Sequence, residues 1–339
     1  MLAGKYLKPK VVEVVEVPLP DVGDHEALIK IEACGFCGSD LGIVAGVHPR
    51  ARAPLTLGHE FSGRIVEIRS SGSTLKAGDL VTAYPLISCG HCYVCRHGEP
   101  HVCRDLRLFG IDVDGGMAEY VKLPVSSLVL LPAQMPARIG ALIEPLAVAV
   151  HGVSMSPIQQ PQTAVVIGAG PIGLLTALVA KARGIPRVLI SDIVPSRVDL
   201  ARRLGLRAVM AGEALTKILM EETGGEGADV VFECAGAPST AREMTALVRC
   251  RGVIVNLGVF KKPAEVDLQI VNFREITIVG SRVYSRHDFE EAVQLASVLP
   301  LERIVTHSFS LRQVEAAFEL FRSGQNACKV LILPDGAPA

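Results

Sequence analysis

Hydrophobic and polar positions change their pattern about halfway along the chain. From Val11 to about Val129, short apolar runs such as "EALIKIEA" and "FSGRIVEI" alternate with Gly, Pro and Asp and show little helical period. This pattern predicts a mostly β region. The following stretch, "GALIEPLAVAVHGV" at residues 140–153, reads instead as a helix.

After "SPIQQPQ" the pattern becomes apolar strand, turn and helix, repeated. The strand-like runs are "AVVIGAG", "RVLISDI", "ADVVFECAG", "GVIVNLG" and "ITIVGS". Five such runs with helical stretches between them predict a parallel sheet covered on both faces. Beyond Tyr284, "HDFEEAVQLAS" and "LRQVEAAFELFRSG" predict amphipathic helices, and "CKVLILP" predicts a closing strand.

The stretch from Thr163 to Ala180 carries no charge and has the bare length of a membrane span. Glycines and a proline interrupt its middle, β-branched residues precede them, and helix formers follow. A buried strand, a tight turn and a buried helix therefore explain the stretch better than a transmembrane helix.

Length and composition narrow the class of protein. A chain of 339 residues suits two domains, each with its own core. Lys and Arg number 34 against 35 Asp and Glu, so the charge favours a small-molecule partner over nucleic acid or a membrane surface. Nine cysteines, several in CxxC spacing, and a start without a signal-peptide pattern predict reduced thiols, metal ligation and the cytoplasm.

The motif "IGAGPIG" has the spacing of a dinucleotide-binding turn, with Pro171 and Ile172 between its last two glycines. Gly168 allows the turn, Gly170 lets a pyrophosphate approach the backbone, and Gly173 lets the helix pack on the strand. Asp192 ends the next strand, where a carboxylate accepts both ribose hydroxyls and repels a 2′-phosphate. NAD is therefore expected over NADP, although a cap or turn role for Asp192 stays open. Arg197 is expected at the surface, within reach of the ribose edge.

A second motif, "CGHCYVCRHGEPHVC", places four thiols in one short loop. They are Cys89, Cys92, Cys95 and Cys103. Four soft ligands close a tetrahedron around zinc without an open position, which predicts a structural site. An iron–sulfur cluster is the rival, but its usual last gap is shorter and ends in Cys-Pro. His91, His97 and His101 are expected to be surface or hydrogen-bonding residues rather than ligands.

A dispersed set of donors accompanies these motifs: Cys37 in "CGFCGSD", His59 and Glu60 in "GHE", and Glu144 in "IEPLAVAVH". One thiolate, one imidazole and one carboxylate leave a zinc position open for substrate. The pair of cysteines at 34 and 37 by itself also fits a redox dithiol or half of a four-cysteine site.

With these motifs in this order, the chain resembles the zinc-containing medium-chain alcohol dehydrogenases over essentially its whole length, and the sorbitol dehydrogenase branch in particular. The resemblance implies an α/β protein in which a Rossmann doubly wound parallel sheet (residues 154–284) joins a mostly β, GroES-like catalytic domain (residues 1–153 and 285–339). It implies Cys37 and His59 as ligands of a catalytic zinc, Glu60 or Glu144 as the third ligand, and Cys34 as a core neighbour. Ser39 would relay a proton. A structural zinc, NAD and a homotetramer or homodimer complete the expectation.

The implied activity is reversible oxidation of a secondary alcohol of a polyol, cyclitol or sugar-like compound by NAD. Alternatives are an L-threonine or butanediol-type dehydrogenase and, from another class, a non-catalytic zinc- and nucleotide-binding member of the family. Two positions depart from the family pattern. Gly42 stands where members often carry a proton-passing histidine, and Val283 and Tyr284 stand where sorbitol dehydrogenases have an Arg-Tyr pair.

Overall fold

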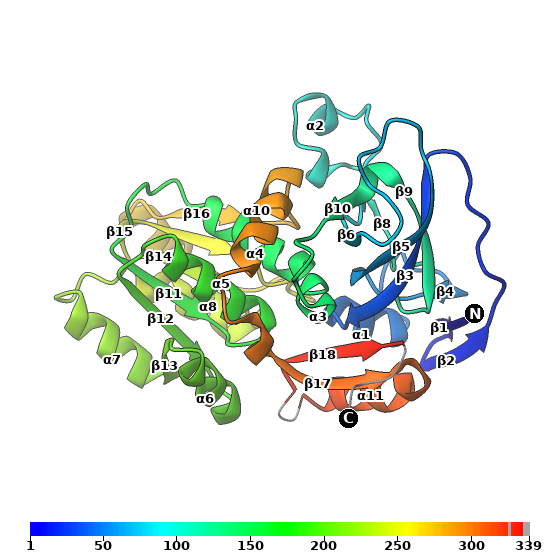
Figure 1. Cartoon of the computed structure of the whole chain (residues 1–339). Coiled ribbons are helices and arrows are strands. Elements are labelled where there is room, and N and C mark those ends of the chain that lie inside the picture. The colour runs from blue at the N-terminus through cyan, green and yellow to red at the C-terminus, as the bar shows by residue number, and fades with distance from the viewer. Residues whose placement is uncertain (325–326, 335–339) are drawn as a thin grey trace. The chain divides into compact units, whose positions relative to one another are not determined.

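The computed structural model describes residues 1–324 and 327–334 of the chain (Figure 1). The chain forms two compact units. One comprises Met1–Glu144 and the chain from Ala292 onward, and the other comprises Pro145–Glu291. Helices α4 (Ile143–Ser154) and α10 (Arg286–Ala296) carry the chain across the two boundaries in the sequence.

The second unit is built on a six-stranded sheet in the order β13-β12-β11-β14-β15-β16, with every neighbouring pair parallel. Its strands are β11 (Thr163–Ile167), β12 (Arg187–Asp192), β13 (Arg207–Met210), β14 (Ala228–Glu233), β15 (Val248–Asn256) and β16 (Thr277–Gly280). This order reverses between β11 and β14, which defines a doubly wound dinucleotide-binding sheet. The predicted parallel sheet is thus confirmed.

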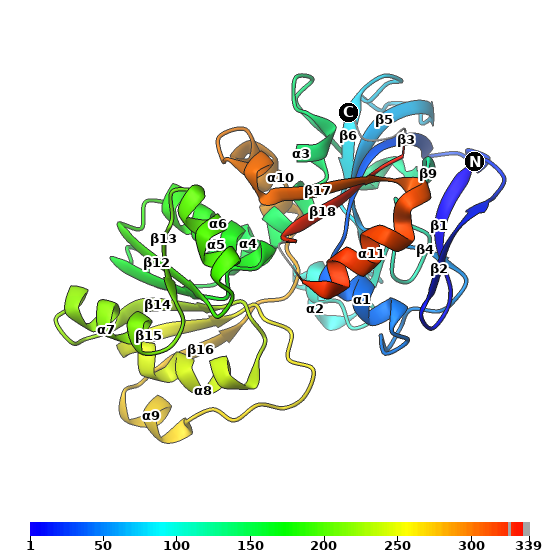
Figure 2. The same cartoon turned by 90° about the horizontal axis from the view of Figure 1, so that it is seen from below.

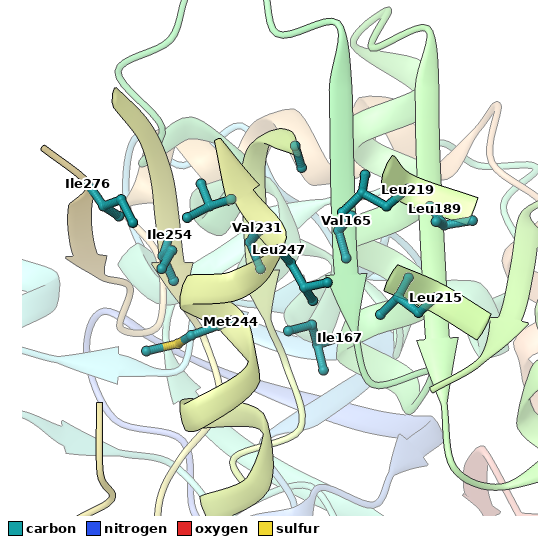
Figure 3. Packing of buried hydrophobic residues seen from close by; sticks show 12 residues of the cluster. Val165, Ile167, Leu189, Leu215, Leu219, Val231, Met244, Leu247, Ile254 and Ile276 are labelled. Carbon is teal, nitrogen blue, oxygen red and sulfur yellow. The ribbon is translucent and has the colours of Figure 1, made fainter. Parts of the chain in front are cut away.

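Helices cover both faces of this sheet (Figure 2). They are α5 (Pro171–Ala182), α6 (Pro195–Arg203), α7 (Glu213–Glu222), α8 (Pro238–Leu247) and α9 (Leu268–Phe273). Figure 3 shows the core under one face, where Leu215 and Leu219 of α7 and Met244 and Leu247 of α8 pack on strand residues such as Val231. Burial on both faces explains why these strands read as continuous apolar runs.

The first unit is mostly β. Its main sheet has the order β10-β6-β5-β3-β18-β17, and β9 also pairs with β3. These strands are β3 (Glu26–Gly35), β5 (Glu60–Arg69), β6 (Leu80–Ala83), β9 (Tyr120–Pro124), β10 (Leu128–Leu130), β17 (Val305–Ser310) and β18 (Lys329–Leu333). A three-stranded sheet contains β1 (Leu2–Lys8), β2 (Val11–Glu16) and β4 (Leu55–Thr56), and a two-stranded sheet contains β7 (Leu86–Ile87) and β8 (Arg107–Leu108).

Short helices accompany these sheets: α1 (Gly38–Val44), α2 (Tyr93–Arg96), α3 (Ala137–Gly140) and α11 (Val314–Ser323). Helix α11 runs beside β17 and β18 (Figure 2). In the described residues, no helix has the length and apolar character that a membrane crossing requires.

The sequence pattern misses strand β1, which lies before the predicted β region, and strands β13 and β17. Strand β13 has four residues at the edge of its sheet, and only Ala208 among them is buried. Strand β17, "VTHSFS", has no fully buried residue. Hydrophobic patterning detects a strand through its buried face, so β13 and β17 lack the signal that it uses.

Candidate active site

Three of the predicted donors lie together in the first unit. Ligand atoms of Cys37, His59 and Glu60 all come within 4.8 Å of one another. Cys37 caps the N-terminus of α1, and Glu60 opens β5. A partly exposed thiol, a buried imidazole and a buried carboxylate form a donor set that suits zinc with a position left open.

Two local contacts restrain the chain beside these donors, one at Gly58 and one at Asp40. Gly58 has φ +91°, and a Cβ there would lie 2.5 Å from the Cys34 sulfur, so a residue with a side chain would not fit. On the other side, the carboxylate of Asp40 accepts a hydrogen bond of 2.8 Å from the Cys37 backbone N–H. Burial raises the pKa of Asp40 to about 6.

Three polar atoms in or beside this cluster are buried and have no hydrogen-bond partner among the described residues: Nδ1 of His59, Oγ of Ser39 and Oδ1 of Asp40. Burial disfavours a charged His59, but the thiolate of Cys37 and the carboxylate of Glu144 outweigh it, so the pKa of His59 lies well above its usual value. Buried polar atoms without partners are uncommon in folded proteins. Their presence beside a thiol and a carboxylate fits a metal ion.

Neither Glu144 nor Cys34 belongs to the cluster of Cys37, His59 and Glu60. Glu144 is buried on α4, and its charge acts on His59, but it does not belong to the cluster of three. Cys34 is fully buried on β3, and burial raises the pKa of its thiol well above the usual value. A thiol held neutral in the core fits the predicted role of core neighbour rather than a redox partner of Cys37.

The four thiols of the cysteine loop converge as well, since their sulfur atoms all lie within 4.8 Å of one another. The sulfur of Cys92 is 3.4 Å from that of Cys95 and 3.8 Å from that of Cys103. These separations are too long for disulfides, and the last is close to the sulfur spacing of a zinc tetrahedron. Hydrogen bonds from backbone N–H groups, first that of Cys95, lower the pKa of Cys92 to about 6. All nine cysteines are described, and all are free.

In each histidine of this loop, Nδ1 lies near an oxygen atom of the chain. Nδ1 of His91 lies 2.9 Å from the Cys89 carbonyl, and Nδ1 of His97 lies 2.8 Å from the Tyr93 carbonyl. His101 is buried rather than at the surface, with Nδ1 3.4 Å from a carboxylate oxygen of Glu99. Donor atoms of Cys89, His91 and Asp105 also lie within 4.8 Å of one another, but Asp105 is exposed and paired with Arg104.

The glycine-rich turn of the second unit has the conformation that its motif predicts. Gly168 has φ +97°, and a Cβ on Gly173 would lie 1.8 Å from the Gly168 carbonyl oxygen. A Cβ on Gly170, the N-cap of α5, would meet no protein atom within 4 Å. Pro171 and Ile172 open α5. The turn thus leaves room in front of a helix N-terminus, as phosphate binding requires.

Asp192 ends β12 next to this turn. One carboxylate oxygen accepts a 2.7 Å hydrogen bond from the Ala169 N–H, and the other accepts a 2.9 Å bond from the Val194 N–H. Nη1 of Arg197 lies 3.6 Å from the first oxygen. Asp192 therefore braces the glycine turn in addition to any contact with a nucleotide.

Two residues of this region were not predicted from the sequence, Asp40 and Lys329. Asp40 was detectable, because an acidic residue three positions after Cys37 fits the N3 position of a capping box. Lys329, whose ammonium group donates a hydrogen bond to Glu60, carries no local signal.

The two departures from the family pattern lie at the pair Val283 and Tyr284 and at Gly42. Tyr284 is buried, with its ring 5.5 Å from that of Phe289. A Cβ on Gly42 would meet nothing within 4 Å.

A doubly wound dinucleotide sheet combined with a β-rich unit that carries a thiol–imidazole–carboxylate cluster defines a metal-dependent dehydrogenase. Comparison with known families agrees. Residues 23–133 match the alcohol dehydrogenase GroES-like domain, and residues 171–298 match the zinc-binding dehydrogenase domain.

Curated relatives cover nearly the whole chain. An L-threonine 3-dehydrogenase of Bacillus subtilis is 37% identical over 94% of this chain and 94% of its own length. A sorbitol dehydrogenase of Halalkalibacterium halodurans is 37% identical over 95% of each chain. The chain belongs to the zinc-binding alcohol dehydrogenase family and is an oxidoreductase.

Solved structures are similar over 98% of this chain, each with a TM-score of 0.90 and over 99% of its own length. A 2R,3R-butanediol dehydrogenase from Bacillus subtilis is 28% identical. An alcohol dehydrogenase from Escherichia coli, complexed with NADH, is 29% identical. A protein described as a zinc-binding dehydrogenase from Sinorhizobium meliloti, bound to NADP, is 32% identical.

Proposed function

We propose that this dehydrogenase interconverts a secondary alcohol and its ketone with NAD, on a polyol, cyclitol or sugar-like substrate. The observation that carries the proposal is the cluster of Cys37, His59 and Glu60, in which the buried His59 Nδ1 atom lacks a partner among the described residues. The glycine turn at Gly168 and Gly170 supplies the place for the dinucleotide.

In this proposal Cys37, His59 and Glu60 hold zinc, and Glu144, whose charge acts on His59, is the alternative third ligand. When bound, zinc supplies Lewis-acid polarisation of the substrate hydroxyl. The chain contributes a site from which water is largely excluded, since His59 and Glu60 are 4% and 1% exposed. Ser39 contributes a hydroxyl that can pass on the proton that an alcohol loses on oxidation.

L-Threonine is the second candidate substrate, favoured by the 37% identity to an L-threonine 3-dehydrogenase. Threonine, sorbitol and 2,3-butanediol share a secondary alcohol next to a carbon that bears another polar group. Measuring NADH formation with polyols, cyclitols, L-threonine and 2,3-butanediol separates these candidates. Turnover of L-threonine well above every polyol would replace the first candidate by the second, and absence of turnover with all of them would contradict the proposed substrate class.

The choice of NAD over NADP is predicted to depend on Asp192. Replacing Asp192 with Ala removes a carboxylate and the two hydrogen bonds that it accepts from backbone N–H groups. We expect NADH binding to weaken by about 10- to 100-fold, the scale of a lost hydrogen bond to a charged group. The gap between NAD and NADP should narrow. Fluorescence titration with NADH and NADPH measures both effects.

Asp192→Asn is the matched control, because it keeps an acceptor oxygen for the turn but lacks the negative charge. It should retain more NADH affinity than the alanine variant while accepting NADPH more readily than the unaltered chain. Equal use of NAD and NADP by the unaltered chain would contradict the role given to Asp192.

The remaining parts of the proposal are a structural zinc on the four-cysteine loop, a cytoplasmic location and a homodimer or homotetramer. The four thiols that converge on the loop support the structural zinc. Nine cysteines outside disulfides are typical of a reducing compartment, which supports the cytoplasmic location. Exposed apolar side chains on α9 and the edge strand β16, including Leu268, Phe273 and Ile278, support association of copies. Light scattering in solution tests the assembly.

A further inference from the structure

Lys329 is a buried cation next to the candidate metal centre. Its side chain is 2% exposed. The ammonium group donates hydrogen bonds of 2.5 Å to Oε2 of Glu60 and 2.9 Å to the Phe36 carbonyl. An ion pair buried this completely is retained at a large desolvation cost, and loss of either partner leaves an uncompensated charge.

The pairing of three strands explains how residues 269 positions apart in the sequence meet. Gly35 of β3 pairs with Glu60 of β5 on one side and with Leu331 of β18 on the other. A Cβ on Gly35 would lie within 2.4 Å of Oε2 of Glu60. The missing side chain at position 35 thus lets the carboxylate of Glu60 extend over β3 toward Lys329 on the next strand.

Lys329 is a cation in a region rich in acidic groups. The thiol of Cys37 and the buried carboxyls of Asp40, Glu60 and Glu144 surround it, and Lys329 and a divalent ion would offset most of their negative charge. The hydrogen bond of 2.5 Å pairs the ammonium group directly with a carboxylate oxygen of Glu60. Lys329 therefore contributes a positive charge to this site.

We propose that Lys329 is a positioning residue of the metal centre, which holds Oε2 of Glu60 so that one carboxylate oxygen at most is offered to zinc. This inference rests on the proposed zinc site at Cys37, His59 and Glu60. Lys329 engages Oε2 and adds a positive charge. It thereby lowers the affinity of the site for zinc and keeps a coordination position open for substrate.

The test is the zinc dissociation constant of the catalytic site, measured by competition with a chromophoric chelator. In Lys329→Met, Glu60 is released and a nearby positive charge is lost, so zinc should bind about 10-fold more tightly or better. The KM for alcohol should rise because Glu60 competes for the open position. Lys329→Arg keeps the charge and should keep an affinity close to that of the unaltered chain. Lys122→Met removes a partly exposed cation that pairs with Glu26 in the same unit, and should change nothing.

A second comparison covers the case in which Lys329→Met fails to fold. Glu60→Gln leaves Lys329 as an uncompensated cation beside the metal, whereas Glu60→Gln with Lys329→Met leaves two neutral groups. Zinc should bind the double variant more tightly than Glu60→Gln by itself. Equal zinc affinities in this comparison, or an unchanged or weakened affinity in folded Lys329→Met, would overturn the inference.

The unaltered chain distinguishes this failure from failure of the proposed function. If it binds two zinc ions and oxidises a secondary alcohol with NAD while the Lys329 variants keep its zinc affinity, then the inference fails by itself. If it binds zinc at the four-cysteine loop only, both are overturned.

Discussion

Cys37→Ala is expected to abolish alcohol oxidation and to remove one of two zinc ions per chain. The variant loses a thiolate from the cluster of three donors. A catalytic metal stabilises developing charge by several kcal/mol, so the rate should fall by roughly 10³-fold or more. NADH binding should persist, because the glycine turn at Gly168 belongs to the other compact unit. Turnover, zinc content and NADH fluorescence on one preparation measure all three effects.

Cys95→Ala is the matched control, since it removes a thiolate from the four-cysteine loop. It should also lose one zinc ion, but its main effect should be lower stability or altered assembly, as expected of a site that holds a loop together. Turnover that survives in Cys37→Ala would show that the catalytic site is misplaced.

Ser39→Ala is expected to slow oxidation by roughly 10²-fold or more, the usual effect of losing a positioned proton-transfer group. The Ser39 Oγ atom is buried, has no hydrogen-bond partner among the described residues and stands two positions after Cys37 on α1. An alcohol that becomes a ketone releases its hydroxyl proton, and this hydroxyl is placed to pass the proton on. The pH profile of turnover, with zinc content checked, measures the effect.

Ser39→Thr keeps a hydroxyl at the same position and should retain most of the activity. Full activity of Ser39→Ala across the pH profile would instead make Ser39 a packing residue, with water carrying the proton. Zinc content should not change in either variant, which separates loss of the relay from loss of the metal.

The sequence predicts the fold well wherever burial produces a pattern. Continuous apolar runs such as the one ending at Ile167 identify strands buried on both faces, and the turn at Gly168 follows from backbone geometry that few residues other than glycine adopt. Edge strands such as β13 and β17 bury too few side chains to produce a hydrophobic pattern in the sequence. Motif spacing also predicts the thiols that converge on one loop, because ligands close in sequence are necessarily close in space.

The sequence does not predict interactions between distant segments. The contact of Lys329 with Glu60 depends on the order β5-β3-β18 and on the missing side chain of Gly35, and neither follows from local sequence. The double role of Asp192, which braces the Ala169 and Val194 amides, likewise appears only in three dimensions. The motifs identify the donors, and the tertiary structure decides what restrains them.

Reversible removal of zinc tests the central claim most directly. The unaltered chain is treated with a chelator while zinc content and NAD-linked oxidation of its best alcohol are followed together. Turnover should disappear in step with loss of one zinc ion per chain and return when zinc is added back, while NADH binding persists throughout. A zinc-depleted chain that oxidises the alcohol at the full rate would contradict the account.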